Sequence, residues 1–302
     1  MSGHRAGFVA IVGRPNAGKS TLLNALLGEK IAIVTPKPQT TRDRIVGVLT
    51  LPEGQIAFVN TPGFHTGKKA LNKHLIHVAL SALQDVEVVL MVLDISRASV
   101  DPGQEDGALL EAVVASEKPA ILVLNKIDKA EKNALLPLMQ AWAGKHAWRA
   151  IIPVSALTED GLGRITSELM SALPVAERLF DPDTLTDKPM RFLVAELVRE
   201  QLMLALGEEL PYSVAVEVTG YHERPDRPLI DIDATIHVER ESQKPMVLGR
   251  GGDTVKMVGS AARQEIEKLA GKQVFLRLHV RVEPNWTRSA RGLKKLGYEA
   301  RS

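Results

Sequence analysis

Residues 13–20 have side-chain types and a spacing that suit phosphate binding. They read Gly-Arg-Pro-Asn-Ala-Gly-Lys-Ser, which fits the pattern G-x-x-x-x-G-K-[ST]. Glycines let the backbone wrap a phosphate, so that several N–H groups face the anion. Lys19 can reach the β- and γ-phosphates of a nucleotide, and the Ser20 hydroxyl can bind Mg²⁺. The residues predicted to contact the nucleotide here are Gly13, Arg14, Pro15, Asn16, Ala17, Gly18, Lys19, Ser20 and Thr21.

A second motif predicts which base is bound. The apolar run 121–124 is typical of a strand buried on both faces, and it leads into Asn125-Lys126-Ile127-Asp128. The Asp128 carboxylate can accept hydrogen bonds from guanine N1–H and from its exocyclic amine. Adenine lacks that amine and would leave the acid unpaired, which is heavily penalised. The Lys126 stem can cover the base, and the turn Ser155-Ala156-Leu157 is expected to offer a backbone amide to guanine O6.

Two further segments are expected to sense the γ-phosphate. Asn60-Thr61-Pro62-Gly63 follows an apolar strand and is similar to the D-x-x-G motif of GTPases, in which the glycine N–H contacts the γ-phosphate. Asn60 replaces the acid of that motif, so we expect weaker Mg²⁺ binding. The polar segment 35–43 resembles a switch I loop, and one of Thr40 and Thr41 is expected to bind Mg²⁺.

The residue after Gly63 is Phe64, which cannot orient water as the glutamine of Ras-like GTPases does. We therefore expect hydrolysis to be slow or to be helped by another group. Asn16 is a candidate, because some GTPases with a similar phosphate loop carry an asparagine here that helps bind K⁺ near the phosphates. A purely structural role for Asn16 in turning the loop is equally open. The candidate catalytic residues are Asn16, Lys19, Thr40, Thr41 and Gly63, and the candidate metal ligands are Ser20, Thr41 and Asn60.

The length of 302 residues suggests two domains. The chain has no cysteine, which favours a reducing cytosol over a disulfide framework, and we expect neither a signal peptide nor a transmembrane segment. Apolar strands alternate with helical patterns up to about residue 175, which predicts an α/β fold with a largely parallel sheet. We predict a nucleotide-binding domain over residues 1–176, a linker over 177–190 and a second, α+β domain over 191–302.

The second domain has a strongly uneven charge. Residues 242–302 hold 13 Lys/Arg against 5 Asp/Glu, which is an electrostatic footprint for a polyanion or a face neutralised by the acidic residues before it. Residues 229–240 alternate apolar and polar, as an antiparallel strand would. Gly249-Arg250-Gly251-Gly252 follows, and then a helix with a buried stripe. G-x-x-G loops of KH domains clamp about four nucleotides of RNA backbone. The candidate RNA-binding residues are Lys244, Gly249, Arg250, Gly251, Gly252, Lys256 and Arg263.

Over essentially its whole length the chain resembles the Era family of bacterial GTPases, in the TrmE-Era-EngA-like group. The resemblance is carried by residues 13–20, 38–42, 60–63, 125–128 and 242–244 leading to 249–252. It implies a P-loop GTPase domain followed by a type II KH domain, with GTP or GDP and Mg²⁺ as ligands. It also implies binding to the 3′ end of 16S rRNA, a role in 30S subunit maturation, and a cytoplasmic protein loosely associated with the inner face of the cell membrane.

Two other classes of function remain as alternatives. A GTPase that acts as a tRNA-modifying or translation enzyme would need a second catalytic site, and the sequence shows no Cys/His cluster that would supply one. A nucleotide-binding protein whose basic end binds lipid would explain the charge. The G-x-x-G loop favours RNA over lipid, because such loops bind nucleic-acid backbone.

Overall fold

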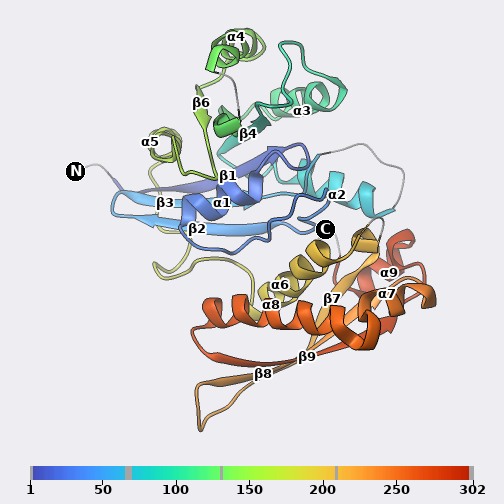
Figure 1. The fold of residues 1–302 in the computed structure, drawn as a ribbon. Coiled ribbons are helices and arrows are strands. Elements are labelled where there is room, and N and C mark those ends of the chain that lie inside the picture. Colours follow the sequence, from blue (N-terminus) through green and yellow to red (C-terminus); the bar gives the residue numbers. More distant parts are fainter. Residues whose placement is uncertain (1–2, 65–69, 130–131, 208–209, 299–302) are drawn as a thin grey trace. The chain divides into compact units, whose positions relative to one another are not determined.

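The structure, a computed structural model, describes residues 3–64, 70–129, 132–207 and 210–298. The chain divides into two compact units (Figure 1). Unit 1 contains most of the first 187 residues, and unit 2 contains the chain from Lys188 onward together with Ile33–Thr40.

Unit 1 is built on a six-stranded sheet in the order β2-β3-β1-β4-β5-β6. All neighbouring strands are parallel except β2, which pairs antiparallel with β3 at one edge. This confirms the predicted α/β class with a largely parallel sheet, although the edge strand β2 was not predicted. The strands are β1 (Arg5–Gly13), β2 (Ile45–Leu51), β3 (Gly54–Asn60), β4 (Val88–Asp94), β5 (Ala120–Asn125) and β6 (Ala150–Val154).

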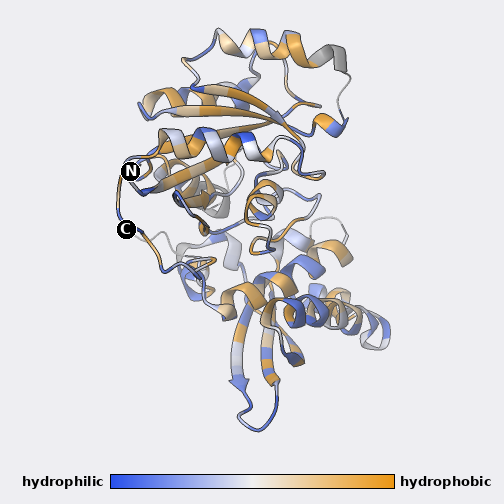
Figure 2. Ribbon diagram, turned by 90° about the vertical axis from the view of Figure 1, so that its left-hand side faces the viewer, coloured by the Kyte–Doolittle hydropathy of each residue, from blue (hydrophilic) through white to orange (hydrophobic). Residues whose placement is uncertain are grey.

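Helices cover the sheet on both faces, which explains why its central strands are apolar throughout. Every residue of β4 and β5 is buried, and Figure 2 shows the strands of this sheet mostly in the orange of apolar residues. Residues of α3 and α4 pack in one core with Ala10, Val12 and Met91, while α1 and α5 contact each other and β3. The helices are α1 (Lys19–Leu27), α2 (Ala70–Ser81), α3 (Gln104–Ala115), α4 (Lys132–Ala143) and α5 (Leu162–Ala172).

This topology gathers the predicted motifs at one edge of the sheet. The parallel strands β1, β3, β4, β5 and β6 end at the same side, where ligands bind in open α/β sheets. Residues 13–20, 60–63, 125–128 and 155–157 directly follow four of these strands. The fifth, β4, ends in Asp94, which the sequence analysis did not consider.

Residues 177–187, most of the predicted linker 177–190, are packed within unit 1. Gln55 accepts hydrogen bonds from the backbone N–H groups of Leu179 and Phe180, both at 2.9 Å. The Phe180 ring meets Phe8 edge to face, and Asp187 accepts a hydrogen bond from Val46 N at 2.9 Å. The segment therefore contacts β1, β2 and β3 of unit 1.

Unit 2 packs helices against a three-stranded sheet in the order β7-β8-β9. The strand expected to be antiparallel, β8, is antiparallel to β7 but parallel to β9. The strands show alternating hydropathy bands in Figure 2, because one face is buried by α6 and α8 and the other is exposed. The elements are α6 (Met190–Ala205), β7 (Ala215–Glu223), β8 (Leu229–Val238), α7 (Lys244–Leu248), α8 (Asp253–Ala270), β9 (Gln273–Val282) and α9 (Ala290–Lys295).

The segment Ile33–Thr40 belongs to unit 2 through its contacts with α6. Ile33 is part of the core of this unit, and Val34 N donates a hydrogen bond to the Glu200 carboxylate at 2.8 Å. The Lys37 ammonium donates to carbonyl groups at the C-terminal end of α6, where a cation is favourable. The buried guanidinium of Arg199 donates to the carbonyl oxygen of Thr40.

Candidate functional site

The loop between β1 and α1 adopts a conformation that its glycines make possible. Gly18 has φ of +95°, and a Cβ atom there would lie 2.2 Å from Asn125 Nδ2. Gly13 passes so close to β4 that a Cβ atom would lie 2.5 Å from the carbonyl oxygen of Val92. α1 begins directly after Gly18 without a side-chain cap, so its first N–H groups are free to face an anion.

Lys19 lies inside this loop. Its ammonium donates to the carbonyl oxygens of Gly13 and Arg14, both at 2.9 Å. Burial lowers the pKa of Lys19 to about 7. A phosphate at the loop would supply the negative charge that this buried cation lacks, so the loop chemistry fits the predicted role.

Three oxygen-bearing side chains meet beside the loop. The Ser20 hydroxyl lies 2.9 Å from the Thr41 hydroxyl, and Asn60 Nδ2 donates to the Ser20 hydroxyl at 3.1 Å. Asn60 Oδ1 is buried and has no hydrogen-bond partner among the residues that the structure describes. Hydroxyl and amide oxygens are ligands that Mg²⁺ accepts, so this donor set fits the metal, although it brings no charge. The Thr40 hydroxyl is instead 2.6 Å from that of Thr35, which selects Thr41 as the metal candidate.

Gly63 and Phe64 lie against the phosphate-binding loop. A Cβ atom at Gly63 would be 2.6 Å from Pro15 Cα, and Phe64 N donates to the Gly13 carbonyl at 3.0 Å. Phe64 is buried in the core of unit 1. Its ring therefore packs inside the unit, which agrees with the inference that it takes no part in orienting water.

The base-side motifs are joined by Asn125. This buried side chain donates to the Ala17 carbonyl at 2.9 Å and accepts from Lys126 N at 2.8 Å and from Ala156 N at 3.0 Å. It thereby ties the phosphate loop to both base-side segments. Asp128 is exposed at the surface, and the Ser155 hydroxyl donates to its carboxylate at 2.6 Å.

An exposed apolar residue completes this part of the site. Leu157, in the turn after β6, keeps 72% of its surface exposed. Leu157 is two residues from Ser155, whose hydroxyl donates to Asp128, so it can contribute an apolar surface near the proposed base site.

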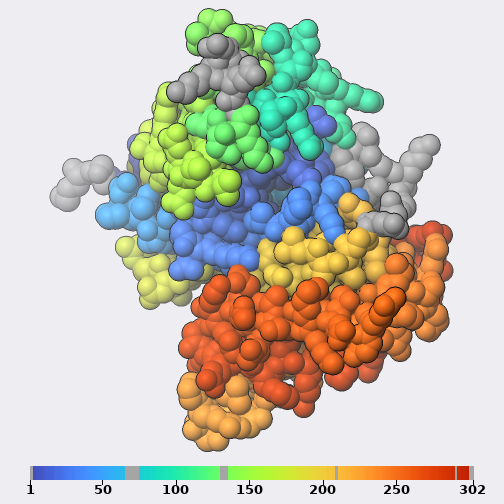
Figure 3. Space-filling model, in the orientation of Figure 1, coloured from blue at the N-terminus to red at the C-terminus, as the bar shows by residue number. Residues whose placement is uncertain are grey.

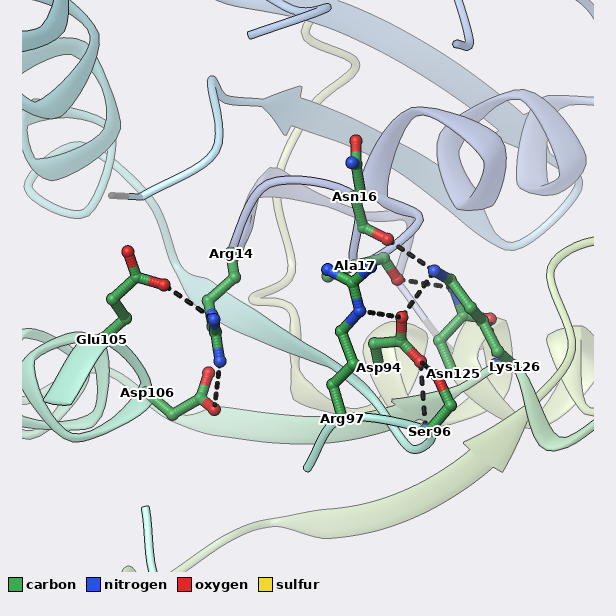
Figure 4. Close-up of polar contacts among 10 residues, drawn as sticks. All are labelled: Arg14, Asn16, Ala17, Asp94, Ser96, Arg97, Glu105, Asp106, Asn125 and Lys126. Carbon is green, nitrogen blue, oxygen red and sulfur yellow. Dashed lines mark hydrogen bonds and ion pairs between the residues drawn. The ribbon is translucent and has the colours of Figure 1, made fainter. Parts of the chain in front are cut away.

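Two clusters of charge in this region were missed by the sequence analysis, and Figure 4 shows both. In the first, Lys126 Nζ lies between Asp94 Oδ2 and the Asn16 carbonyl, at 2.6 Å from each. In the second, Arg14 leaves the phosphate loop to pair with Glu105 at 2.8 Å and Asp106 at 3.3 Å on α3. The signal for Asp94 was its place directly after the apolar strand β4, at the same sheet edge as the other motifs.

In unit 2, the predicted glycine loop connects α7 to α8. Gly249, Gly251 and Gly252 all have positive φ, at 76°, 57° and 84°. A Cβ atom at Gly249 would lie 2.2 Å from the hydroxyl of Thr254, so this position also needs the missing side chain. Gly252 precedes the first residue of α8, whose N-terminal N–H groups point toward the loop.

A groove of about 480 Å³ lies between α8 and β9, and Lys256 on its wall donates to the Gly251 carbonyl at 3.4 Å. Figure 3 shows α8 exposed on the face turned to the viewer. The groove has apolar and cationic sides, formed by Val255, Lys256, Gly259, Ser260, Arg263, Val274, Phe275, Leu276 and Leu278. A second hollow of about 520 Å³ continues past Phe275 to Arg224 and Arg227. Lys256 and Arg263 were predicted, whereas Lys244 does not line the groove.

Phe275 was missed although the sequence signals it. β9 alternates, and Phe275 shares its exposed face with Arg277, His279 and Arg281 instead of the buried face. It keeps 51% of its surface exposed. An aromatic ring on the polar side of an edge strand is suited to contact a ligand.

Comparisons with known proteins find similar sequences for both units. The sequence profile of 50S ribosome-binding GTPases matches residues 8–126, and the profile of KH domains matches residues 209–287. GTPase Era of Geobacter metallireducens is 46% identical over 294 residues, covering 97% of this chain and 98% of that protein. GTPase Era of Geotalea uraniireducens is 47% identical over 295 residues, covering 98% of each.

Solved structures show the same similarity. A crystal structure of Era in complex with MgGDPNP and nucleotides 1506–1542 of 16S ribosomal RNA superposes with a TM-score of 0.94 at 38% identity, covering 98% of this chain and 100% of that one. An Aquifex aeolicus Era variant bound to GDP·AlF4⁻ gives the same TM-score, identity and coverage. With full-length relatives above 40% identity and both units matched, the chain belongs to the Era family of GTPases, with a P-loop GTPase unit followed by a KH unit.

Proposed function

We propose that this GTPase is a switch protein whose KH unit binds the 3′ end of 16S rRNA and which acts in maturation of the 30S ribosomal subunit. The observation that carries the proposal is the glycine loop at the head of the α8/β9 groove. Support comes from the related Era structure, which holds MgGDPNP and nucleotides 1506–1542 of 16S ribosomal RNA.

The groove suits single-stranded RNA better than a duplex. Backbone phosphates would lie against the glycine loop and the N-terminus of α8, with Lys256 and Arg263 alongside. Bases would enter between the apolar residues of α8 and β9. At Gly259, α8 lies so close to β9 that a Cβ atom would be 3.3 Å from the Leu278 side chain. The groove is therefore narrow at this point. Phe275 would offer a stacking surface.

In the GTPase unit we propose that the loop 13–20 holds the phosphates and that Asp128, oriented by Ser155, reads the guanine edge. Lys19 would stabilise negative charge on the β- and γ-phosphates, and the Gly63 N–H would contact the γ-phosphate. Ser20, Thr41 and Asn60 would hold Mg²⁺, which neutralises phosphate charge when bound. Because Phe64 is buried, we propose that K⁺ bound near Asn16 assists hydrolysis.

The cytoplasmic location and the peripheral membrane association implied by the family resemblance remain predictions. Within the described part of the chain, no helix combines the length and the apolar character needed to cross a membrane.

The RNA assignment is tested by replacing Arg250 and Gly251 with aspartate. New negative charges at the loop repel phosphate, and a side chain at Gly251 is strained because φ is positive there. We expect binding of a single-stranded 16S 3′-end RNA to fall at least tenfold by fluorescence anisotropy, a loss of the size expected for one or two phosphate contacts. GTP binding should stay near the parent value, because all the proposed nucleotide residues lie in the other unit.

A matched control is the double change of Gln264 and Lys268 to aspartate. It alters net charge by the same amount, and both side chains are exposed on α8 outside the groove. This control should bind RNA almost as the parent does. Equal losses in both variants would mean that only net charge matters. Binding to anionic vesicles without binding to RNA would support the lipid alternative instead.

A further inference from the structure

Asp94 ends β4 as a nearly buried carboxylate, with 9% of its surface exposed. Its Oδ1 accepts hydrogen bonds from the Ser96 backbone N–H at 3.0 Å and from the Ser96 hydroxyl at 2.6 Å. Its Oδ2 accepts from Lys126 Nζ at 2.6 Å, while the more exposed Arg97 is 4.0 Å away. Burial alone would raise the pKa of Asp94, but the hydrogen bonds from Lys126 and Ser96 outweigh burial and hold it below its usual range. The group is therefore a fixed anion at neutral pH.

This anion determines where the Lys126 ammonium lies. The second partner of that ammonium is the Asn16 carbonyl of the phosphate loop, also at 2.6 Å (Figure 4). Between these anchors the lysine stem crosses the loop, with Cε 3.8 Å from the position of a Cβ atom on Gly18. A lysine otherwise samples many rotamers, and ordering it costs entropy. The pair with Asp94 orders the Lys126 side chain in the protein itself, so nucleotide binding does not have to order it.

The backbone at Lys126 shows that this placement is specific. Its φ of +70° is unfavourable for a residue with a side chain, and the conformation needs support from its surroundings. The hydrogen bond from Lys126 N to Asn125 Oδ1 supports it on one side, and the Asp94 pair on the other. Asp128 lies two residues further on, so the same support sets its distance from the phosphate loop.

We propose that Asp94 is a positioning residue for guanine-nucleotide binding, which acts by holding Lys126 against the phosphate loop so that the base and the phosphates are bound in one fixed spacing. The inference rests on the proposed guanine site at Asp128. Asp94 contacts no reacting atom and acts through Lys126. Its removal therefore weakens GTP and GDP equally, because the two nucleotides share the base and the ribose.

The test uses Asp94→Asn in the full chain. Asn keeps the shape and an acceptor for Ser96 but has no charge for Lys126. We expect the Kd values for GTP and GDP to rise together by roughly tenfold, the size of a lost charge-assisted hydrogen bond. KM for GTP should rise by the same factor, while kcat at saturation stays near the parent value. A purely structural role would lower the unfolding midpoint without this KM-against-kcat split.

A double-mutant cycle with Lys126→Met shows whether Asp94 acts through the lysine. In the Lys126→Met background, Asp94→Asn should cause no further loss of nucleotide affinity. Asp101→Asn is the matched control. This variant removes another acid–lysine pair, in which Asp101 Oδ1 lies 3.1 Å from Lys145 Nζ. The Asp101 side chain is 89% exposed. This control should leave both Kd values unchanged.

Parent-like nucleotide affinity in Asp94→Asn, or additive losses in the double variant, would overturn the positioning role. Asp128→Ala separates this failure from failure of the proposed guanine site. If Asp128→Ala weakens GTP binding but Asp94→Asn does not, only the present inference is wrong. If Asp128→Ala has no effect, the guanine site itself is misassigned.

Discussion

At the residue scale, two asparagines, Asn60 and Asn16, lie in the proposed nucleotide site of this chain. Asn60 lies where the related motif has an acid, and its buried Oδ1 has no partner among the described residues. Asn16 has φ of +62° in the phosphate loop, and Figure 4 shows its amide directed away from Lys126. The buried Oδ1 of Asn60 suits a cation held by neutral oxygen atoms.

Asn60→Asp should tighten Mg²⁺ binding. The new carboxylate would lie beside the Ser20 hydroxyl, which also meets that of Thr41, and would add the charge that this donor set lacks. A Mg²⁺ titration of GTP hydrolysis should shift its midpoint several-fold lower. Thr41→Val removes a proposed hydroxyl ligand of Mg²⁺ and should shift this midpoint to a higher Mg²⁺ concentration. An unchanged midpoint in Asn60→Asp would show that the amide oxygen already suffices.

Asn16 should make hydrolysis depend on K⁺. With Phe64 buried, a cation near the phosphates can add charge stabilisation to that proposed for Lys19. GTP turnover should be several-fold faster in KCl than in NaCl at equal ionic strength. Asn16→Ala should abolish the difference while GTP binding persists. Equal rates of the parent protein in both salts would leave Asn16 with a structural role only.

At the element scale, the phosphate loop is braced by α3. Arg14 pairs with Glu105 and Asp106 in the first turn of this helix, where acids also interact favourably with the helix dipole. Asp106 is 4% exposed, and its Oδ1 has no hydrogen-bond partner in the described part of the chain. Burial raises the pKa of Asp106, and the opposing attraction of Arg14 only reduces the shift.

This shift predicts how Asp106→Asn changes stability with pH. A carboxyl whose pKa is raised by folding favours the folded state most when protonated, and this advantage is lost as the pH rises through the folded pKa. The neutral amide avoids the loss. Asp106→Asn should therefore raise the free energy of unfolding at pH 7, and the gain should shrink as the pH falls through that pKa.

Chemical denaturation of both proteins at several pH values measures the difference. Asp101→Asn serves as control, because Asp101 is exposed and should show no such trend. A parent protein that is more stable than Asp106→Asn at pH 7 would mean that the pair with Arg14 outweighs the cost of burial.

At the scale of the whole molecule, residues 242–302 carry an excess of positive charge, with 13 Lys/Arg against 5 Asp/Glu. RNA binding should therefore weaken as salt rises. If Arg250, Lys256 and Arg263 neutralise three phosphates, the slope of log K against log salt should be roughly −2 for single-stranded RNA. Filter binding or anisotropy at several salt concentrations gives the slope. It should become shallower by roughly 0.7 in Arg250→Gln, which removes one cation.

The sequence alone determined the parts of this protein whose chemistry is local. Short motifs specify Gly13, Gly18 and Lys19 of the phosphate loop, and another specifies Asp128. Backbone conformation and side-chain type within a few residues are enough to specify them. Strand and helix periodicity then predicted the α/β class and the buried stripe of α8, because burial on one face or both leaves a direct pattern.

Tertiary structure decided everything that depends on which distant segments meet. It favours Thr41 over Thr40 as the candidate Mg²⁺ ligand, because the Thr41 hydroxyl contacts that of Ser20. The Thr40 hydroxyl instead contacts that of Thr35, and the Thr40 carbonyl accepts a hydrogen bond from Arg199. It grouped Ile33–Thr40 with α6 and packed the expected linker along β2 and β3. It also brought Asp94 to Lys126, 32 residues away. Such pairings leave no periodic trace in the sequence, because each depends on the order of strands in the sheet and on burial that the whole chain creates.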